Sequence, residues 1–246
     1  MNAIKNRFGN ARVLLPVVHC IHYAQAAAAI YCAIRNGADG VFLINQGGMR
    51  HQEVAMMAAD FIGETFVGVN LLEFGRAAVY QLPKQSRVSV WSDNAGFEPN
   101  ADPKQLDAFH DRLKLDRSPR DMGWQGLYFG GVAFKYQREV PLGQCGGEAI
   151  LAAQLGVDVV TTSGPATGHP PSPEKVQAMH TALVAARGDH ALAIASGITP
   201  ENVEPFLPYV NAFLVATGIE SSFGVFDPGR VQALADAIHG FDNAAE

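Results

Sequence analysis

The chain of 246 residues carries 18 lysines and arginines against 24 aspartates and glutamates, a formal net charge of −6. No run of basic residues occurs, which argues against a protein that binds nucleic acid through a positive surface. With 48% hydrophobic residues, the chain is long enough to bury a large core, and backbone donors can still bind a small anionic substrate locally.

The cysteines and the apolar segments bear on location. Cys20, Cys32 and Cys145 are widely spaced and form no CxxC pair, which is typical of a reducing cytoplasm rather than of a disulfide framework. No signal-peptide-like stretch follows Met1, and the alanine-rich segment 24–29 is too short for a membrane span. We therefore expect a cytoplasmic protein without a membrane partner.

Continuous apolar runs recur along the chain, and such runs are typical of parallel strands buried on both faces. They predict eight strands, at 13–18, 41–45, 65–71, 88–92, 127–132, 157–162, 191–196 and 213–217. Helical patterns lie between most of them, at 24–36, 52–62, 146–155, 174–187 and 201–207, and a last one at 230–239 closes the chain.

Local signals mark where helices begin and end. A capping residue followed by proline predicts helix starts at Asp102-Pro103, Ser172-Pro173, Thr199-Pro200 and Asp227-Pro228. Gly37 and Gly156 fit the left-handed residue after a helix, and each precedes an aspartate at the entrance of the next strand. Strict alternation of strands and helices predicts a single (β/α)8 barrel over 1–246, with an open doubly wound sheet as the alternative if the strand count is in error.

The active site of such a barrel lies at the carboxyl ends of its strands, and the predicted ends are polar. They present His19, Asn45, Asn70, Asp93, Lys135, Ser163, Gly164, Ser196, Gly197, Thr217 and Gly218. Ordinary turn formation explains Asn, Ser and Gly at strand ends one at a time. It does not explain His19, Asp93 and Lys135 together, so these three are the candidate catalytic residues.

Each of the three has a chemical role and a plain alternative. Asp93 follows an apolar strand containing Trp91, so it is a candidate acid or base of raised pKa, a Mg2+ ligand, or only a turn residue. Lys135 between apolar residues is suited to forming a Schiff base or neutralising charge, unless it merely covers the barrel rim with its stem. His19 is suited to proton transfer.

The remaining candidates are assigned to binding. Asn45, Asn70, Ser163 and Gly164 are expected to contact substrate, and Ser196, Gly197, Thr217 and Gly218 to bind phosphate. The loops after strands seven and eight are the recurring phosphate location of this fold, and a helix opening at Thr199-Pro200 would add free N–H groups. Two ordinary glycine turns are the alternative. The loop 164–171 is expected to cover the barrel mouth, and segment 97–120 to be a lid or a subunit contact.

Two resemblances accompany these motifs. Residues 196–203 and 215–220, with Phe226-Asp227, resemble the end of phosphoribosylanthranilate isomerase-type barrels of the ribulose-phosphate-binding superfamily, whose members hold phosphate with these two loops. The His19 strand end, residues 37–45, Thr162-Ser163-Gly164, Thr167-Gly168 and Pro171-Ser172, with 196–203, resemble the BtpA family.

The chain also departs from the isomerase pattern. His19-Cys20-Ile21-His22 stands where those isomerases have their catalytic cysteine in a Lys-x-Cys-Gly context, and Asp93 is no obvious counterpart of their catalytic aspartate. The resemblance therefore implies the fold and the phosphate site, and it does not carry over the reaction.

Three function classes follow. The first is an isomerase, mutase or lyase acting on a small phosphorylated metabolite, with a Mg2+-dependent phosphonomutase and a phosphoribosyl-type isomerase or transferase as variants. The second is a BtpA-like, non-enzymatic assembly factor. The third, a nucleic-acid binder, is disfavoured by the acidic charge. A homo-oligomer is expected, because soluble barrels often pair symmetrically.

Overall fold

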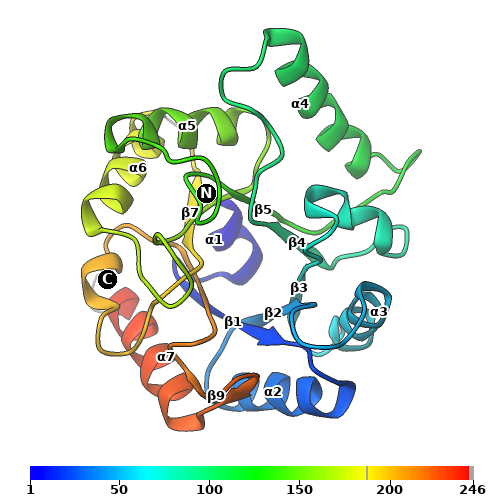
Figure 1. Cartoon of the computed structure of the whole chain (residues 1–246), viewed down its shortest axis with the longest axis vertical. Coiled ribbons are helices and arrows are strands. Elements are labelled where there is room, and N and C mark those ends of the chain that lie inside the picture. The colour runs from blue at the N-terminus through cyan, green and yellow to red at the C-terminus, as the bar shows by residue number, and fades with distance from the viewer. Residues whose placement is uncertain (187, 244–246) are drawn as a thin grey trace.

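The computed structural model describes residues 1–186 and 188–243. Eight parallel strands form a closed barrel in the order β1-β2-β3-β4-β5-β6-β7-β8 (Figure 1). Their bounds are β1 Val13–His19, β2 Gly40–Ile44, β3 Phe66–Asn70, β4 Ser89–Ser92, β5 Tyr128–Gly131, β6 Val159–Thr162, β7 Ala191–Ile194 and β8 Ala212–Val215. Pairing of β1 with β8, from Val13 opposite Ala212 to Pro16 opposite Val215, closes the ring. The (β/α)8 prediction is confirmed, and the open sheet is excluded.

Helices surround the barrel in the described ranges. They are α1 Ala3–Phe8, α2 Tyr23–Arg35, α3 His51–Phe61, α4 Pro103–Arg117, α5 Leu142–Gln154, α6 Pro173–Ala185 and α7 Pro228–Asn243, with two short 3-10 helices, η1 Gly75–Gln81 and η2 Glu204–Phe206. A small antiparallel hairpin, β9 Glu220–Ser222 and β10 Val225–Phe226, follows β8. The helix predicted over 174–187 corresponds to α6. The last residue of that prediction, Arg187, lies outside the described residues. No helix of the described chain is long and apolar enough to cross a membrane.

The strands are apolar throughout because both of their faces are buried. Along β1, Val13, Leu15 and Val17 pack into the barrel interior, while Leu14 and Val18 pack against the surrounding helices. Side chains alternate along a strand, so the next inward position after Val17 is His19. The alternation that places Val13, Leu15 and Val17 in the core therefore also points His19, the last residue of β1, toward the barrel mouth.

An aromatic cluster fills the interior around Phe42. Its ring centroid lies 4.9 Å from that of Phe129, 5.9 Å from Trp91 and 6.0 Å from Phe66. On β3, Gly68 provides the space, since a Cβ there would lie 2.1 Å from Phe42 Cε1. Large and small side chains thus alternate across neighbouring strands, as close packing of a barrel interior requires.

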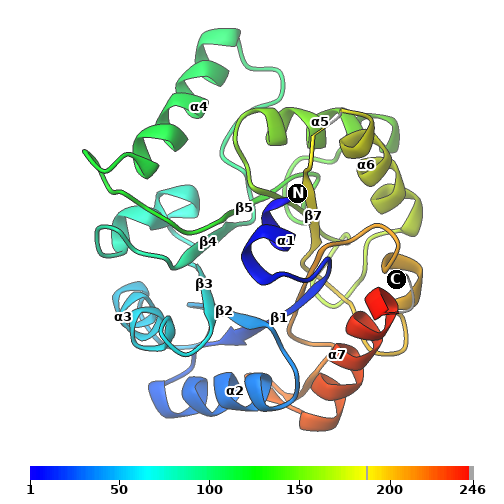
Figure 2. The same ribbon diagram turned by 180° about the vertical axis from the view of Figure 1, so that it is seen from behind.

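The amino end of the barrel is closed by α1, a helix that the sequence patterns did not predict. Figure 2 shows α1 lying across this end of the barrel. Ile4 is fully buried in the interior cluster, and the Phe8 ring lies 4.8 Å from that of Phe66. Because this end is plugged, access to the interior is from the carboxyl ends of the strands.

The two predicted glycine–aspartate junctions are confirmed. Gly37 and Gly156 adopt φ angles of +90° and +98°, as left-handed residues after a helix should. Asp39 Oδ2 accepts a hydrogen bond from the N–H of Leu14 at 2.8 Å, and Asp158 Oδ2 from that of Tyr128 at 2.7 Å. Each carboxylate thus links the residue before one strand to the backbone of the preceding strand, at the end of the barrel opposite the mouth.

Of the four predicted helix starts, three are confirmed and one is wrong. Asp102 and Ser172 cap α4 and α6, and α7 begins at Pro228. No α-helix follows Thr199-Pro200, where only η2 forms, over Glu204–Phe206. Prolines at 205 and 208 lack the N–H groups that a continuing helix needs. The helix dipole expected behind the strand-seven loop is therefore absent from this part of the described chain.

Segment 97–120, expected to be a lid or a subunit contact, contains α4. Figures 1 and 2 show α4 standing out from the ring of helices. Asp116 on α4 is buried and anchors it, accepting hydrogen bonds from Arg76 and Tyr80 of η1. Neither the lid nor the subunit contact is tested by this arrangement, and both stay predictions.

Candidate functional site

A cavity of about 230 Å3 opens at the carboxyl ends of the strands. It brings together six of the candidate residues, namely His19, Asp93, Lys135, Ser196, Gly197 and Thr217. Apolar side chains from five strands line its deeper part: Val17, Ile44, Trp91, Ala195 and Leu214. In the closed strand order β1 and β5 are four strands apart, so His19 and Lys135 approach the cavity from opposite walls.

Asp93 and Lys135 form the charged pair of this cavity. Burial raises the pKa of Asp93, and this rise is opposed by the hydrogen bond from Asn70 and by the charge of Lys135. Burial likewise lowers the pKa of Lys135, opposed by the charges of Asp93 and Tyr136. Both shifts favour the neutral forms and narrow the gap between the two pKa values. Such a pair is suited to exchanging protons with a bound molecule.

Asn70 orients the carboxylate of this pair. Its side chain is buried, and Nδ2 donates a hydrogen bond to Asp93 Oδ1 at 2.9 Å. Asn70 does not line the cavity within the part of the chain that the structure describes. The structure thus brings it to the site as a support for Asp93, while its predicted contact with substrate stays a prediction.

The loop that carries Lys135 is held in an unusual conformation. Ala133 and Tyr136 adopt φ angles of +49° and +60°, in the left-handed region that costs a non-glycine residue about 1–3 kcal/mol. Ser163 Oγ accepts a hydrogen bond from the Lys135 N–H at 2.7 Å. The ammonium group of Lys175 donates to the carbonyls of Ala133 and Ser163. Ser163 and Lys175 therefore fix the backbone on either side of Lys135.

His19 on the opposite wall is paired with a carboxylate. Its Nδ1 lies 2.8 Å from Glu220 Oε1, and the ring of Phe223 stacks on the imidazole with centroids 4.4 Å apart. Glu220 and Phe223 belong to the β9–β10 segment that follows β8. This segment contacts His19 because the barrel closes β8 against β1.

Trp91, which lines the apolar part of the cavity, has an unsatisfied donor. Its indole Nε1 is buried and has no hydrogen-bond partner among the described residues. A buried N–H without a partner costs about 1–3 kcal/mol and calls for an explanation. Protein atoms enclose Nε1, so the cavity is lined by other parts of the Trp91 ring.

The glycines of the predicted phosphate loops are required by contacts between loops. Gly197 has a φ of +64°, and a Cβ there would lie 2.2 Å from the backbone of His169 and Pro170. A Cβ on Gly218 would lie 1.8 Å from the carbonyl oxygen of Ile198, and one on Gly164 would lie 2.0 Å from that of His169. Thr167 and Gly168 of the 164–171 loop line the cavity, as the expected cover should.

Two donors expected for phosphate are already occupied. The Ser196 hydroxyl donates to the Ala166 carbonyl oxygen at 3.0 Å. The N–H of Thr199 donates to Asn202 Oδ1 at 2.8 Å, and Asn202 Nδ2 donates to the Gly197 carbonyl at 2.9 Å. The groups of these loops that face the cavity come from Ser196, Gly197 and Thr217. Phosphate binding by them, and by Gly218 beside them, stays a prediction.

We expect Gly197→Ala to destabilise the chain by at least about 1–3 kcal/mol, because alanine is strained at this φ and its Cβ meets the 164–171 loop. Gly147→Ala is the matched control, since Gly147 lies in α5 with nothing within 4 Å of a Cβ. The control should gain about 0.5–1 kcal/mol from helix propensity. Urea denaturation of both variants checks this, and equal stabilities would contradict the close loop contact.

Five candidates lie outside the cavity lining: Asn70, Ser163 and Gly218, described above, together with Asn45 and Gly164. Asn45 bridges the ends of β2 and β3, donating to Glu73 Oε2 at 2.7 Å and accepting from the Leu72 N–H at 3.0 Å. Gly164 begins the 164–171 loop and packs against the His169 and Pro170 carbonyls at its other end. Sequence reasoning in turn missed Glu220 and Lys175 as site residues. Closure of the barrel was the available signal for Glu220, since whatever follows β8 must lie beside the end of β1.

The donor set of the cavity gives little support to the predicted Mg2+ site, which stays a prediction. This ion prefers one or two carboxylates with nearly ideal octahedral geometry. Asp93 is the single carboxylate lining the cavity in the described chain, and the cationic Lys135 neighbours it. No group of three or more His, Cys, Asp or Glu side chains suited to a metal occurs among the described residues. We therefore assign no step to Mg2+.

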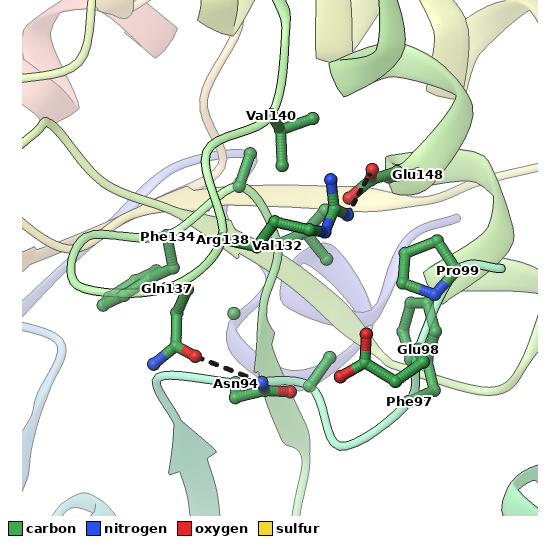
Figure 3. A pocket seen from close by; sticks show the side chains of 13 residues that line it. Asn94, Phe97, Glu98, Pro99, Val132, Phe134, Gln137, Arg138, Val140 and Glu148 are labelled. Carbon is green, nitrogen blue, oxygen red and sulfur yellow. Dashed lines mark hydrogen bonds and ion pairs between the residues drawn. The ribbon is translucent and has the colours of Figure 1, made fainter. Parts of the chain in front are cut away.

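A second, smaller hollow of about 110 Å3 lies beside this cavity, between the loops after β4 and β5 (Figure 3). Two pairs bridge its walls: Asn94 Nδ2 donates to Gln137 Oε1 at 3.2 Å, and Arg138 pairs with Glu148 at 2.6 Å. Arg138 and Glu148, two of its charged groups, thus bind each other. We place the candidate site in the central cavity, where Asp93 and Lys135 face open space.

Comparisons with known proteins agree with this architecture. No family profile matches the chain. A curated N-(5'-phosphoribosyl)anthranilate isomerase from Pyrobaculum islandicum is 52% identical over 50 residues, which are 19% of this chain and 23% of the isomerase. The match thus spans about a quarter of that relative. The predicted resemblance to isomerase-type barrels is confirmed.

Solved structures show the same fold at low identity. The 3-keto-L-gulonate-6-phosphate decarboxylase of Vibrio cholerae aligns with a TM-score of 0.61 and 12% identity over 94% of this chain and 99% of its own. The (S)-3-O-geranylgeranylglyceryl phosphate synthase of Thermoplasma acidophilum aligns with a TM-score of 0.60 and 13% identity over 98% and 99%. Both are TIM-barrel enzymes named for phosphorylated small molecules.

Proposed function

We propose that this chain is an enzyme of the isomerase, mutase or lyase type that acts on a small phosphorylated carbonyl compound in the central cavity. The observation that carries the proposal is the Asp93–Lys135 pair, whose pKa values are shifted toward each other inside a cavity that the β7 and β8 ends also line. Shifted acid–base pairs in a cleft mark catalytic sites more often than structural ones.

Lys135 would act on the carbonyl oxygen of the substrate. Its ammonium form can neutralise the negative charge that develops there, and its neutral form can instead attack the carbonyl carbon, releasing water to form an imine. Asp93, oriented by Asn70, would exchange protons with the oxygen atoms of the substrate.

The phosphate would lie at the β7 and β8 ends, near Ser196, Gly197 and Thr217. Three considerations support this placement. These groups line the cavity, this position is the usual phosphate location in the fold, and the similar solved enzymes are named for phosphorylated compounds. Among the other predicted classes, the Mg2+-dependent phosphonomutase would have Asp93 as its single carboxylate from the described cavity lining, beside Lys135. The assembly factor has no arrangement of residues that favours it.

Inorganic phosphate tests the binding half of the proposal without a known substrate. We expect millimolar phosphate to raise the melting temperature, because a ligand that binds only the folded state stabilises it by RT ln(1 + [L]/Kd), about 2.7 kcal/mol at one hundred times Kd. Thr217→Val and Ser196→Ala should each reduce the shift. The controls are chloride at equal ionic strength and Thr181→Val on α6. An unchanged shift in Thr217→Val and Ser196→Ala would contradict this site.

The predicted homo-oligomer stays a proposal as well. Sedimentation velocity of the full chain at several concentrations would test it.

A further inference from the structure

The His19–Glu220 pair is nearly closed off from solvent. The side chains are 8% and 6% exposed, and Nδ1 lies 2.8 Å from Oε1. The same carboxylate oxygen accepts a second hydrogen bond, from the Gly224 N–H at 2.9 Å. An oxygen that receives two N–H donors is fixed in place, so Glu220 holds one defined geometry toward the imidazole.

The hairpin that carries Glu220 is itself tied to β1 and α2. The side chain of Gln25 donates from Nε2 to the Gly224 carbonyl and accepts at Oε1 from the Ile21 N–H at 3.0 Å. Phe223 lies stacked on the His19 ring although its own side chain is 53% exposed. A large apolar ring held over one histidine shields that histidine from water.

These contacts fix the tautomer of neutral His19. An ionised carboxylate only accepts hydrogen bonds, so the proton of the neutral ring must be on Nδ1, facing Glu220. The lone pair is then on Nε2. No described residue donates to or accepts from Nε2, and His19 lines the central cavity. A base oriented by a buried carboxylate is the arrangement by which histidine abstracts protons in many enzymes.

We propose that His19 Nε2 is the proton-accepting group of this site, that Glu220 is its positioning residue, and that the substrate is a phosphorylated aldehyde or ketone with a proton on the carbon beside its carbonyl. This inference rests on the proposed function. It adds a role for His19, which lies on the wall of the cavity opposite Lys135. Lys135 follows β5 and His19 ends β1, so a substrate lying between them meets a base on one side and a cation on the other.

The step balances without any co-reactant. Nε2 takes the proton from the carbon beside the carbonyl, and the electron pair of that C–H bond moves to the carbonyl oxygen as the enolate forms. Lys135 stabilises the oxygen, and Glu220 stabilises the imidazolium. When that carbon also carries a hydroxyl, Asp93 takes the hydroxyl proton and delivers it to the enolate oxygen. The imidazolium of His19 then returns its proton to the former carbonyl carbon while the hydroxyl oxygen becomes the new carbonyl oxygen, which completes an isomerisation and regenerates neutral His19.

Nitrogen NMR of the histidine rings in the full chain tests the orientation directly, with no substrate. At alkaline pH we expect His19 to show a protonated Nδ1 and an unprotonated Nε2, with its signals assigned by their loss in His19→Gln. His110 is an internal reference, because its Nδ1 lies 2.9 Å from the Leu155 carbonyl oxygen and must carry a proton. A proton on Nε2 of neutral wild-type His19 would overturn the proposal.

Two variants distinguish a specific effect of the Glu220 carboxylate on the His19 tautomer from a general effect of removing a negative charge. Glu220→Ala should abolish the single tautomer of His19 and leave that of His110 unchanged. Glu201→Ala removes a carboxylate that binds Arg230 at 2.9 Å and not His19, so it should change neither. A preserved Nδ1–H form in Glu220→Ala would refute the role of Glu220. If this variant does not fold, the wild-type spectrum still decides the orientation.

Turnover tests the rest, once a phosphorylated aldehyde or ketone has been found to react. Glu220→Gln should lower kcat by up to about 10⁴-fold with little change in KM, as amide replacement of a carboxylate that orients a histidine base does. An effect no larger than that of Glu201→Gln would overturn the positioning role. Should the tautomer be as expected while phosphate and the phosphorylated carbonyl compounds fail to bind, the proposed function fails and the orientation of His19 stands.

Discussion

Lys135→Met is expected to lower turnover of a phosphorylated carbonyl substrate by about 10²–10⁴-fold, the range for loss of a proton-transfer or charge-stabilising group. Methionine keeps much of the apolar stem and removes the amine, so the loss reports on chemistry rather than packing. Lys104→Met is the matched control, because Lys104 is exposed on α4. Steady-state kinetics of the two variants makes the measurement. A loss of less than tenfold in Lys135→Met would remove Lys135 from the mechanism.

The same lysine can be examined before any substrate is known. Burial lowers the pKa of Lys135, so a larger fraction of it is the neutral, reactive amine at a given pH. Limited reductive methylation followed by mass spectrometry should therefore modify Lys135 ahead of Lys104. Because the charge of Asp93 raises the pKa of Lys135, Asp93→Asn should lower it further and speed the modification. Slower modification in Asp93→Asn would show that the two groups do not interact.

Phe42→Ala should produce the largest loss of stability, about 3–5 kcal/mol, as for other phenylalanines removed from a core. Phe42 is fully buried and contacts the rings of Phe66, Trp91 and Phe129. In the described interior these rings surround it closely, so little collapse into the space is available. For a chain of this size we expect the melting temperature to fall by roughly 6–20 °C.

Leu115→Ala is the control for Phe42→Ala, because Leu115 is 49% exposed on α4 and should cost no more than about 0.5 kcal/mol. Calorimetry or urea denaturation compares the two variants. If Phe42→Ala costs as little as Leu115→Ala, the aromatic cluster does not pack as described. Because Trp91 also lines the cavity, Phe42→Ala should weaken phosphate-dependent stabilisation as well.

Much of the fold could be predicted because strands and helix starts depend on residues that are close together in the sequence. Apolar runs predicted eight strands, since strands buried on both faces must be apolar at successive positions. Asp102-Pro103 and Ser172-Pro173 marked real helix starts because capping and the φ of proline act within a few residues. The helix predicted to begin at Thr199-Pro200 does not form, and the reason is also local. The prolines at 205 and 208 interrupt a helix within its first turns, whatever signal precedes it.

The candidate site was predicted only in part. Period-two alternation along a strand is enough to turn His19 inward with Val17, and the barrel fold is enough to gather the strand ends, so His19, Asp93 and Lys135 were found together. The sequence could not tell which polar strand ends face the cavity. Asn45 bonds to Glu73, Asn70 supports Asp93, and Ser163 fixes the loop of Lys135.

The sequence by itself thus determined the strands, most helix starts and the set of residues at the barrel mouth, because each depends on neighbours a few positions away. Only the tertiary structure decided the pairings across the ring: Glu220 with His19, and Asp93 with Lys135. Glu220 and His19 are 201 positions apart in the chain and meet because β8 closes on β1. The pKa shifts of Asp93 and Lys135 depend on burial and on each other's charge, two properties that exist only once the barrel has formed.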